Sequence, residues 1–314
     1  MGELWWKLPG IWLLQTVLRC FNPNYVPGDY YEFAERVLNL GWASLFLQHK
    51  CNLKYIIPSE NRAKVILQKI DGHIVYEDNT EINIEEAIAC LKKYPVFMAK
   101  RARGTGGGKG VQKIVLKEHS DLDSFLRDLL APIDIEFEEV IQQSEFLAQF
   151  NSDSVNTLRF VTLNINEKCT LLSTFFRMGG KGSVVDNLSG GHGVLVGVDK
   201  DGKINDFGVN HKFDEKIYES PTGFKFAGMK IPEFDRVKQQ IIDFHKKIPY
   251  ANLIGWDVTI DKEGNPIVIE VNLDSAWVEA HQVFNGPIFG ERQEEVMDYI
   301  AKRKSSLRHL MIIF

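Results

Sequence analysis

An alternation of polar and apolar residues near the C-terminus constrains the fold of this chain most. Glu270 and Asn272 alternate with apolar residues over 267–272, so both side chains leave the same face of a predicted β-strand. A second strand-like run, 253–260, carries Asp257, and the turn residues between the two runs predict an antiparallel hairpin. Three oxygen donors then lie together, facing solvent, in a set that suits Mg²⁺ beside a nucleotide's phosphates. The alternative is an ordinary solvated hairpin.

Composition places the chain among globular proteins large enough for two or more subdomains. It has 314 residues, of which 44% are hydrophobic and 25% are charged. The net charge of −5 offers no field that would draw the whole molecule to nucleic acid, so we predict no nucleic-acid partner. Four cysteines (Cys20, Cys51, Cys90 and Cys169) lie far apart without a CxxC pair. This spacing argues against a zinc site or disulfide framework and favours the cytoplasm.

The N-terminus is strongly apolar and carries Trp5, Trp6 and Trp12. Pro9 interrupts this stretch, and the remainder is shorter than the ~20 apolar residues that span a bilayer. We expect a helix that packs on the core. A peripheral membrane or protein contact through the three tryptophans is the alternative, which would make the protein membrane-associated within the cytoplasm.

Changes of pattern along the chain predict three parts: a helical segment over 1–54, an α+β subdomain over 55–134, and a larger subdomain over 135–314. In the middle part, short strands are expected at 55–57, 64–67, 73–76, 95–100 and 112–116. Asn83 and Glu86 form a predicted capping box for a helix through residue 93, and Ser120 begins a second helix that ends near residue 130. The last part resumes with strands at 135–141, 157–163 and 170–177.

The loop over 101–110 is rich in glycine, including Gly106, Gly107 and Gly108. Such a loop can bring backbone N–H groups against phosphate oxygens. It fits neither the Walker pattern nor the dinucleotide pattern, and it joins strand to strand. A lid over phosphates and a flexible surface turn remain, and Lys100 at the end of the preceding strand favours the lid. The kinase-like triplet at 206–208 lacks the other kinase motifs and is a chance match.

Five stretches, in order, together resemble the ATP-grasp fold: 98–111, 138–141, 154–159, 186–191, and 255–257 with 270–272. The chain looks most similar to the sugar-transfer-associated ATP-grasp group, with kinship to glutamate and lysine-carrier ligases. The resemblance covers about residues 50 to 282. It implies an α+β architecture in which two α+β subdomains clasp ATP, preceded by a helical segment.

The resemblance also implies roles for individual residues. Contacts with ATP are implied for Lys50, Lys100, the glycine loop, Glu138, Glu139, Ile141 and Glu145, of which Glu138 to Ile141 would read adenine and Glu145 the ribose. The family usually has Asp-Lys where this chain has His49-Lys50. Mg²⁺, or Mn²⁺ as an alternative, would be held by Asp257, Glu270 and Asn272. Catalytic roles are implied for Arg159, Arg177 and Asn187, and substrate contacts for His192 and Gln282.

The two arginines lie in apolar strand-like runs, where a charge is costly unless it is paired. They can neutralise a transferring phosphoryl group, and a buried ion pair with a strand carboxylate is the alternative.

The activity implied is that of an ATP-dependent carboxylate–amine ligase, which forms an amide through an acyl phosphate. Its substrates would be a small carboxylate and an amine that are linked to a sugar. The reaction would belong to the synthesis of a polysaccharide or a related metabolite. A kinase built on the same fold and a nucleotide-binding scaffold protein are the alternatives.

Overall fold

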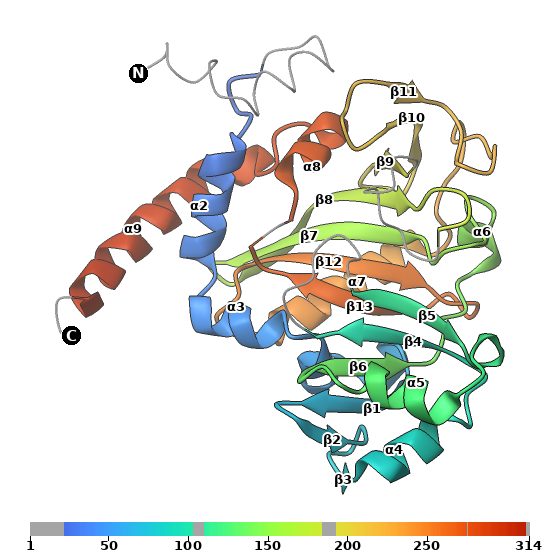
Figure 1. Cartoon of the computed structure of the whole chain (residues 1–314). Helices are drawn as coiled ribbons and strands as arrows, with labels where there is room; N and C mark the ends of the chain where they lie inside the picture. Colours follow the sequence, from blue (N-terminus) through green and yellow to red (C-terminus); the bar gives the residue numbers. More distant parts are fainter. Residues whose placement is uncertain (1–21, 103–109, 184–192, 275, 312–314) are drawn as a thin grey trace.

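Two antiparallel sheets of different size organise the chain (Figure 1). The computed structural model describes residues 22–102, 110–183, 193–274 and 276–311. The first described elements are the helices α2 (Gly28–Leu38) and α3 (Gly41–Leu47) and the short 3₁₀ helices η2 (Lys50–Tyr55) and η3 (Ser59–Asn61). No helix in these ranges is long and apolar enough to cross a membrane.

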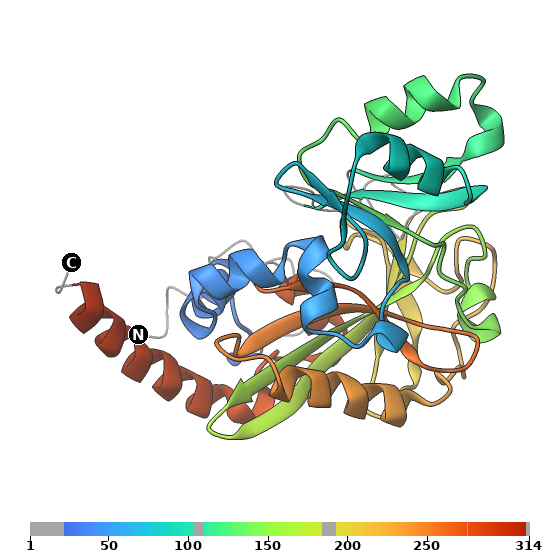
Figure 2. The same cartoon turned by 90° about the horizontal axis from the view of Figure 1, so that it is seen from below.

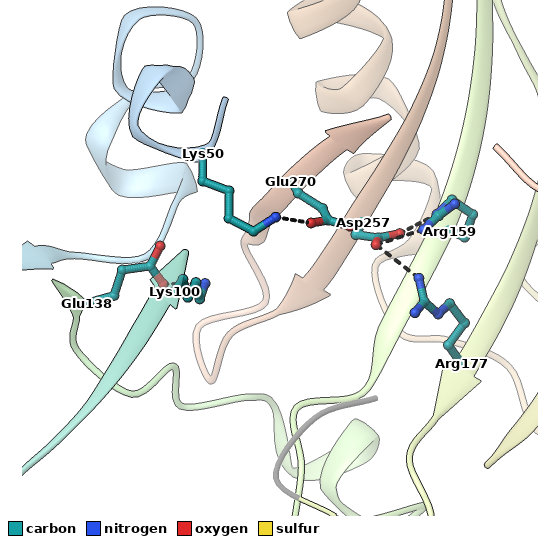
Figure 3. Close-up of polar contacts among 7 residues, drawn as sticks. All are labelled: Lys50, Lys100, Glu138, Arg159, Arg177, Asp257 and Glu270. Atoms are coloured by element: carbon teal, nitrogen blue, oxygen red, sulfur yellow. Dashed lines mark hydrogen bonds and ion pairs between the residues drawn. The ribbon is translucent and has the colours of Figure 1, made fainter. Parts of the chain in front are cut away.

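The smaller sheet has six strands in the order β3-β2-β1-β6-β4-β5. Its strands are β1 (Val65–Ile70), β2 (His73–Val75), β3 (Glu81–Ile82), β4 (Val96–Arg101), β5 (Val111–Val115) and β6 (Ile135–Glu138). Helices α4 (Ile84–Leu91) and α5 (Leu122–Leu129) and the 3₁₀ turn η4 (Leu116–Glu118) complete this subdomain. Both helices pack on one apolar face, where Phe97 and Phe137 meet edge to face. The opposite face is polar and turns toward the larger sheet (Figure 3).

The larger sheet has seven strands in the order β11-β10-β9-β8-β7-β12-β13. The strands are β7 (Thr157–Ile165), β8 (Lys168–Met178), β9 (Val194–Val198), β10 (Ile204–Val209), β11 (Lys216–Ile217), β12 (Leu253–Ile260) and β13 (Pro266–Asn272). The predicted hairpin is confirmed, because β12 and β13 pair antiparallel around a turn in which Gly264 takes a positive φ of 81°. That conformation is easy for glycine and strained for other residues.

Helices cover both faces of the larger sheet (Figure 2). Helix α7 (Phe234–Lys246) packs against Phe160, Trp256 and Val258 on one face. The other face is covered by α2, by α8 (Val278–Asn285) and by α9 (Gln293–Met311), which follows the short turn η6 (Gly290–Arg292). The short helix α6 (Glu145–Ala148) lies in the connection from β6 to β7. Successive side chains of a strand point to opposite faces of its sheet. Polar residues near one end of a strand can therefore point into the space between the two sheets.

Three sequence expectations need correction. Residues 55–57 do not form a strand, because η2 continues through Tyr55 and the chain then turns. The capping box of Asn83 and Glu86 is confirmed, but Asp121 rather than Ser120 caps α5, since its carboxylate accepts a hydrogen bond from the backbone N–H of Ser124. Asp257 does not face solvent, as described below.

A fourth correction concerns the boundary at residue 135. The sequence assigned a strand over 135–141 to the larger subdomain, but the observed strand, β6, ends at Glu138 and lies inside the smaller sheet between β1 and β4. The chain crosses to the larger sheet only after Glu138, where the N–H of Ser144 donates to the carbonyl of Ile260. β6 is fully buried, and a strand paired on both sides is held by the sheet that supplies its partners.

Candidate active site

A row of charged side chains crosses three neighbouring strands of the larger sheet. Arg159 on β7 lies directly opposite Asp257 on β12, and Asp257 lies opposite Glu270 on β13. Directly opposed residues on adjacent strands point to the same face, so the three side chains line up on one surface of the sheet. Two of the three predicted metal ligands are therefore neighbours, as the hairpin required.

Asp257 is the centre of this row and is only 4% exposed. Arg159 donates to both of its carboxylate oxygens, with Nη2 2.8 Å from Oδ2, and Nη1 of Arg177 lies 3.0 Å from the same oxygen (Figure 3). Burial alone would raise the pKa of Asp257, but Arg159 and then Arg177 hold that pKa well below its usual range. The buried ion pair that the sequence left as an alternative for the two arginines is thus present.

Glu270 is paired from a different part of the chain. Nζ of Lys50, in η2, lies 2.8 Å from Oε2 of Glu270 (Figure 3). Lys50 is nearly buried, whereas the Glu270 side chain remains 30% exposed. The segment that precedes the smaller sheet therefore reaches the metal-ligand candidates of the larger one.

Asn272 follows Glu270 on the same face of β13. Its Nδ2 atom is buried, and among the described residues it has no hydrogen-bond partner. An unsatisfied buried amide is costly unless a ligand group or water completes it.

The smaller sheet contributes a second buried polar group on the face opposite α4 and α5. Lys100 on β4 forms an ion pair with Glu138 on β6, and both side chains are at least nine-tenths buried (Figure 3). Glu136 lies opposite Lys100 and Gln68 in the strand register, and the Gln68 amide donates to it. The second hydrogen bond of that amide goes to the carbonyl of Cys51 in η2, 3.1 Å away.

Burial and mutual repulsion separate the pKa values of the two glutamates. Burial, followed by the charge of Glu138, raises the pKa of Glu136 to about 8. Burial alone would also raise the pKa of Glu138, but Lys100 and a hydrogen bond from Glu136 lower it. Burial alone would lower the pKa of Lys100. The charge of Glu138, followed by those of Glu136 and Glu270, outweighs burial and raises that pKa. These opposite shifts favour a protonated Glu136 beside a charged pair of Glu138 and Lys100.

Other predicted site residues fall elsewhere or outside the described residues. Gln282 is fully buried in α8, where its amide binds the backbone N–H and carbonyl of Val26. It therefore anchors the start of the N-terminal helices and does not join the charged row. Glu139 and Ile141 lie just beyond β6, and Glu145 is exposed in the first turn of α6. The loop glycines Gly106, Gly107 and Gly108, together with Asn187 and His192, lie outside the described residues.

The donor set fits a hard cation. Asp257 and Glu270 supply neighbouring carboxylates and Asn272 supplies an amide, the oxygen ligands that Mg²⁺ prefers. No group of three or more His, Cys, Asp or Glu that could hold a metal occurs among the described residues. A cation at this row thus depends on the two carboxylates, the amide and whatever oxygens a ligand brings.

Sequence reasoning missed Glu136 and Gln68. The signal was present: Ile135-Glu-Phe-Glu138 alternates apolar and acidic residues, which predicts a strand with one acidic face. It also missed Glu35 in α2, which is 1% exposed and accepts a hydrogen bond from the backbone N–H of Ala276. Burial raises the pKa of Glu35 to about 7. A local signal was present, because Glu35 lies at helical spacing with Tyr31, Ala34 and Leu38, which form the buried stripe of this helix.

Comparison with solved structures finds distant similarity. The biotin carboxylase domain of 2-oxoglutarate carboxylase from Hydrogenobacter thermophilus, solved with MgADP, ADP and bicarbonate, is 14% identical, with 77% of this chain and 46% of that chain covered and a TM-score of 0.46. The D-alanine–D-alanine ligase from Coxiella burnetii is 9% identical, with 86% and 62% covered and a TM-score of 0.47. N5-carboxyaminoimidazole synthetase from Staphylococcus aureus with ADP is 14% identical, with 73% and 45% covered and a TM-score of 0.42. The chain spans less than two thirds of each of these solved chains.

A search of curated proteins finds no match. Residues 61–298, most of the chain, match the family described as sugar-transfer associated ATP-grasp. This match confirms the resemblance, and the two sheets with their covering helices confirm the predicted α+β fold. The chain belongs to the sugar-transfer associated ATP-grasp family.

Proposed function

We propose that this protein is an ATP-dependent carboxylate–amine ligase. One observation carries the proposal: cations and carboxylates from both sheets converge on the space between them. The larger sheet brings Arg159, Arg177 and Asp257 together, and Lys50 bridges to Glu270. Lys100, paired with Glu138, lies on the face of the smaller sheet that turns toward them. Membership of an ATP-grasp family supports a nucleotide as the ligand of this space.

In this proposal the side chains divide the work between binding and charge neutralisation. Lys100 and Lys50 would contact the phosphates of ATP, and Asp257, Glu270 and Asn272 would hold Mg²⁺. When bound, the ion neutralises charge between the terminal phosphates. Arg159 and Arg177 would neutralise charge on the transferring γ-phosphoryl group, for which a planar guanidinium group is suited.

The proposed reaction needs no covalent bond between the substrate and the enzyme. A substrate carboxylate attacks the γ-phosphorus, the bond to the ADP oxygen breaks, and an acyl phosphate forms. An amine then attacks the acyl carbon, inorganic phosphate leaves, and the amine loses a proton. The products are an amide, ADP and phosphate. The description of the family as sugar-transfer associated supports a sugar-linked substrate class, in polysaccharide or related metabolite synthesis.

A product assay tests this proposal. The purified protein is incubated with ATP, Mg²⁺ and paired sugar acids, amino acids and amines, while ADP, inorganic phosphate and amide products are measured together. We expect equal amounts of ADP and phosphate, and only when a carboxylate and an amine are both present. A phosphorylated hydroxyl product without free phosphate would identify a kinase instead. The control is the Glu270→Gln variant, which keeps the size of this partly exposed side chain but removes its charge. It should hold the metal poorly and form no product.

A further inference from the structure

Helix α2 carries two buried polar side chains that the proposed contacts with ATP and Mg²⁺ leave unused. Tyr31 and Glu35 are four residues apart, so they lie on the same face of the helix, and they are 2% and 1% exposed. The ring of Tyr31 packs on that of Phe289, with the ring centres 5.9 Å apart. The Tyr31 hydroxyl group is buried and has no hydrogen-bond partner among the described residues. Such a group is costly to bury, so it indicates a place that a ligand completes.

The Glu35 carboxylate lies beside the charged row of the larger sheet. Gly255 is opposite Asn272 in the strand register, and it precedes Asp257 by two residues, on the same face of β12. Ala276 covers this glycine, because a Cβ atom added to Gly255 would lie 3.2 Å from that of Ala276 and 3.4 Å from that of Asn272. The backbone N–H of Ala276 donates to Oε1 of Glu35, 3.1 Å away. The glycine therefore lets the segment that holds Glu35 pack close to the metal-ligand candidates.

Tyr31 borders the same part of the sheet. It packs in one apolar cluster with Val161, which lies opposite Gly255 on β7 and two residues from Arg159 on the same face. Burial raises the pKa of Tyr31, and the charge of Glu35 raises it further, whereas Arg159 lowers it. Arg159 also opposes the effect of burial on the pKa of Glu35. The hydroxyl and the carboxylate therefore both lie near the Arg159 end of the row.

The charges around Tyr31 and Glu35 favour a cation over an anion. After burial, Asp274 raises the pKa of Glu35, and Glu279 adds to the rise in the pKa of Tyr31. The nearby cation Arg159 is already paired with a buried carboxylate. A carboxylate ligand would meet like charges here. An ammonium group, which has three N–H donors and no acceptor, suits a carboxylate and a hydroxyl oxygen that lie side by side.

We propose that Glu35 and Tyr31 bind the amine substrate of the ligase. This inference rests on the proposed function and gives its second substrate a place. The ammonium group donates to the Glu35 carboxylate and to the Tyr31 hydroxyl oxygen, while the carboxylate substrate lies at the row, beside the arginines. Two residues along a strand span about 7 Å, so an amine at the level of Gly255 lies close to an acyl group at the level of Asp257.

Glu35 also accepts a proton in the proposed amide-forming step. The ammonium group first gives one proton to the Glu35 carboxylate and becomes a nucleophile. Its nitrogen then attacks the acyl carbon, the C–N bond forms, and the bond from that carbon to the phosphate oxygen breaks. The departing phosphate takes the second proton from the nitrogen. A carboxylate suits the first transfer here because burial raises the pKa of Glu35 to about 7, near the pH at which such a base is most effective.

Hydroxylamine separates the two halves of the reaction, because it is uncharged at neutral pH and attacks an acyl phosphate without a base. The full chain is incubated with ATP, Mg²⁺ and sugar acids or amino acids, and with either hydroxylamine or an amine probe (glucosamine, ethanolamine or glycine). We expect Glu35→Gln to form hydroxamate within about twofold of wild type but amide about a hundredfold more slowly. Tyr31→Phe should raise the KM for the amine about tenfold and change kcat little. Asp29→Asn and Tyr30→Phe, on the same helix, are the matched controls and should behave like wild type.

Denaturant unfolding tests whether the pair serves only the fold. Tyr31→Phe removes a hydroxyl group that has no partner, and Glu35→Gln keeps an acceptor for the N–H of Ala276, so neither should lower the unfolding midpoint. A fall in both midpoints would show a structural role and overturn the inference.

The hydroxamate result separates this inference from the proposed function. If wild type forms hydroxamate and Glu35→Gln loses hydroxamate and amide equally, or loses neither, the amine does not bind at Glu35 and the inference is overturned. Hydroxamate without amide from any of the three probes would also overturn it, because the nucleophile is then not an amine of this kind. If wild type forms neither product and releases no ADP, the proposed function itself is wrong, and the amine site is withdrawn with it.

Discussion

Arg177 reaches Asp257 from β8, one strand beyond Arg159, with Nη1 3.0 Å from Oδ2 of the carboxylate. Two guanidinium groups therefore share one carboxylate. Together with the Lys50–Glu270 pair, the row holds three cations against two anions. The excess positive charge on a nearly buried surface is the electrostatic reason to expect an anionic ligand there.

Asp257→Ala should destabilise the fold as well as end activity. The substitution leaves Arg159 and Arg177 without their buried counter-charge, and breaking a buried pair from one side costs about 3–5 kcal/mol. Denaturant unfolding followed by circular dichroism measures the loss. The companion variant Asp257→Leu, Arg159→Met, Arg177→Met removes all three charges and should recover most of the stability but no turnover. An unchanged unfolding midpoint for Asp257→Ala would refute the buried network.

Glu136→Gln should make the protein more stable at alkaline pH. The folded-state pKa of Glu136 is raised from its usual value of 4.5 to about 8, so between these values the native state holds a proton that the unfolded chain releases. The contribution of Glu136 to the free energy of unfolding is fully present below about pH 4.5. It falls by ~1.4 kcal/mol per pH unit as the pH rises from there to about 8, where the native carboxyl group loses its proton. The difference in unfolding free energy between variant and wild type should therefore grow over this window. Glu139→Gln, at an exposed position just beyond the same strand, is the control that should follow wild type.

Lys50→Met should weaken nucleotide binding much more than stability. Its partner Glu270 is partly exposed, so loss of the pair costs about 1 kcal/mol of folding free energy, whereas loss of a phosphate contact should raise the Kd for MgADP at least about tenfold. Titration calorimetry gives the Kd. Lys54→Met, in the same 3₁₀ helix but bonded to Asn79, is the matched control. A Kd that is equal in the two variants would remove Lys50 from the nucleotide site.

Lys100→Met tests whether this lysine serves the ligand or only the fold. Alone, the variant leaves Glu138 buried and charged, so both stability and MgADP affinity should fall. Adding Glu138→Gln removes the stranded charge and should restore the unfolding midpoint. MgADP affinity should remain at least about tenfold reduced in the double variant. Recovery of affinity along with stability would mean that Lys100 has a structural role only.

Local patterns predicted the strands well and the charge network only in part. Alternation placed Asp257 opposite Glu270, and the Asn83 capping box fixed the start of α4, because both signals act over a few residues. Burial is set by the rest of the chain. The sequence therefore could not show that Arg159 and Arg177 enclose Asp257, since these contacts join residues 98 and 80 positions apart.

The position of β6 shows the same limit. Its apolar–acidic alternation predicted a strand, but not which sheet would take it, because both sheets were plausible partners for a strand between two subdomains. The same uncertainty hid the Gln68–Glu136 contact, which exists only once β6 lies beside β1. Helical spacing placed Glu35 among buried apolar residues, but not the distant backbone N–H of Ala276 that it contacts.

The 3₁₀ helix η2 touches both halves of the molecule: the carbonyl of Cys51 accepts a hydrogen bond from Gln68 in the smaller sheet, and Lys50 holds Glu270 in the larger one. The family match begins at residue 61, beyond this turn. A fragment cut to the matched boundaries would lose this connection between the two sheets and the lysine that is proposed to bind phosphate. Any excised version meant to capture a nucleotide therefore has to retain the residues upstream of the family signature.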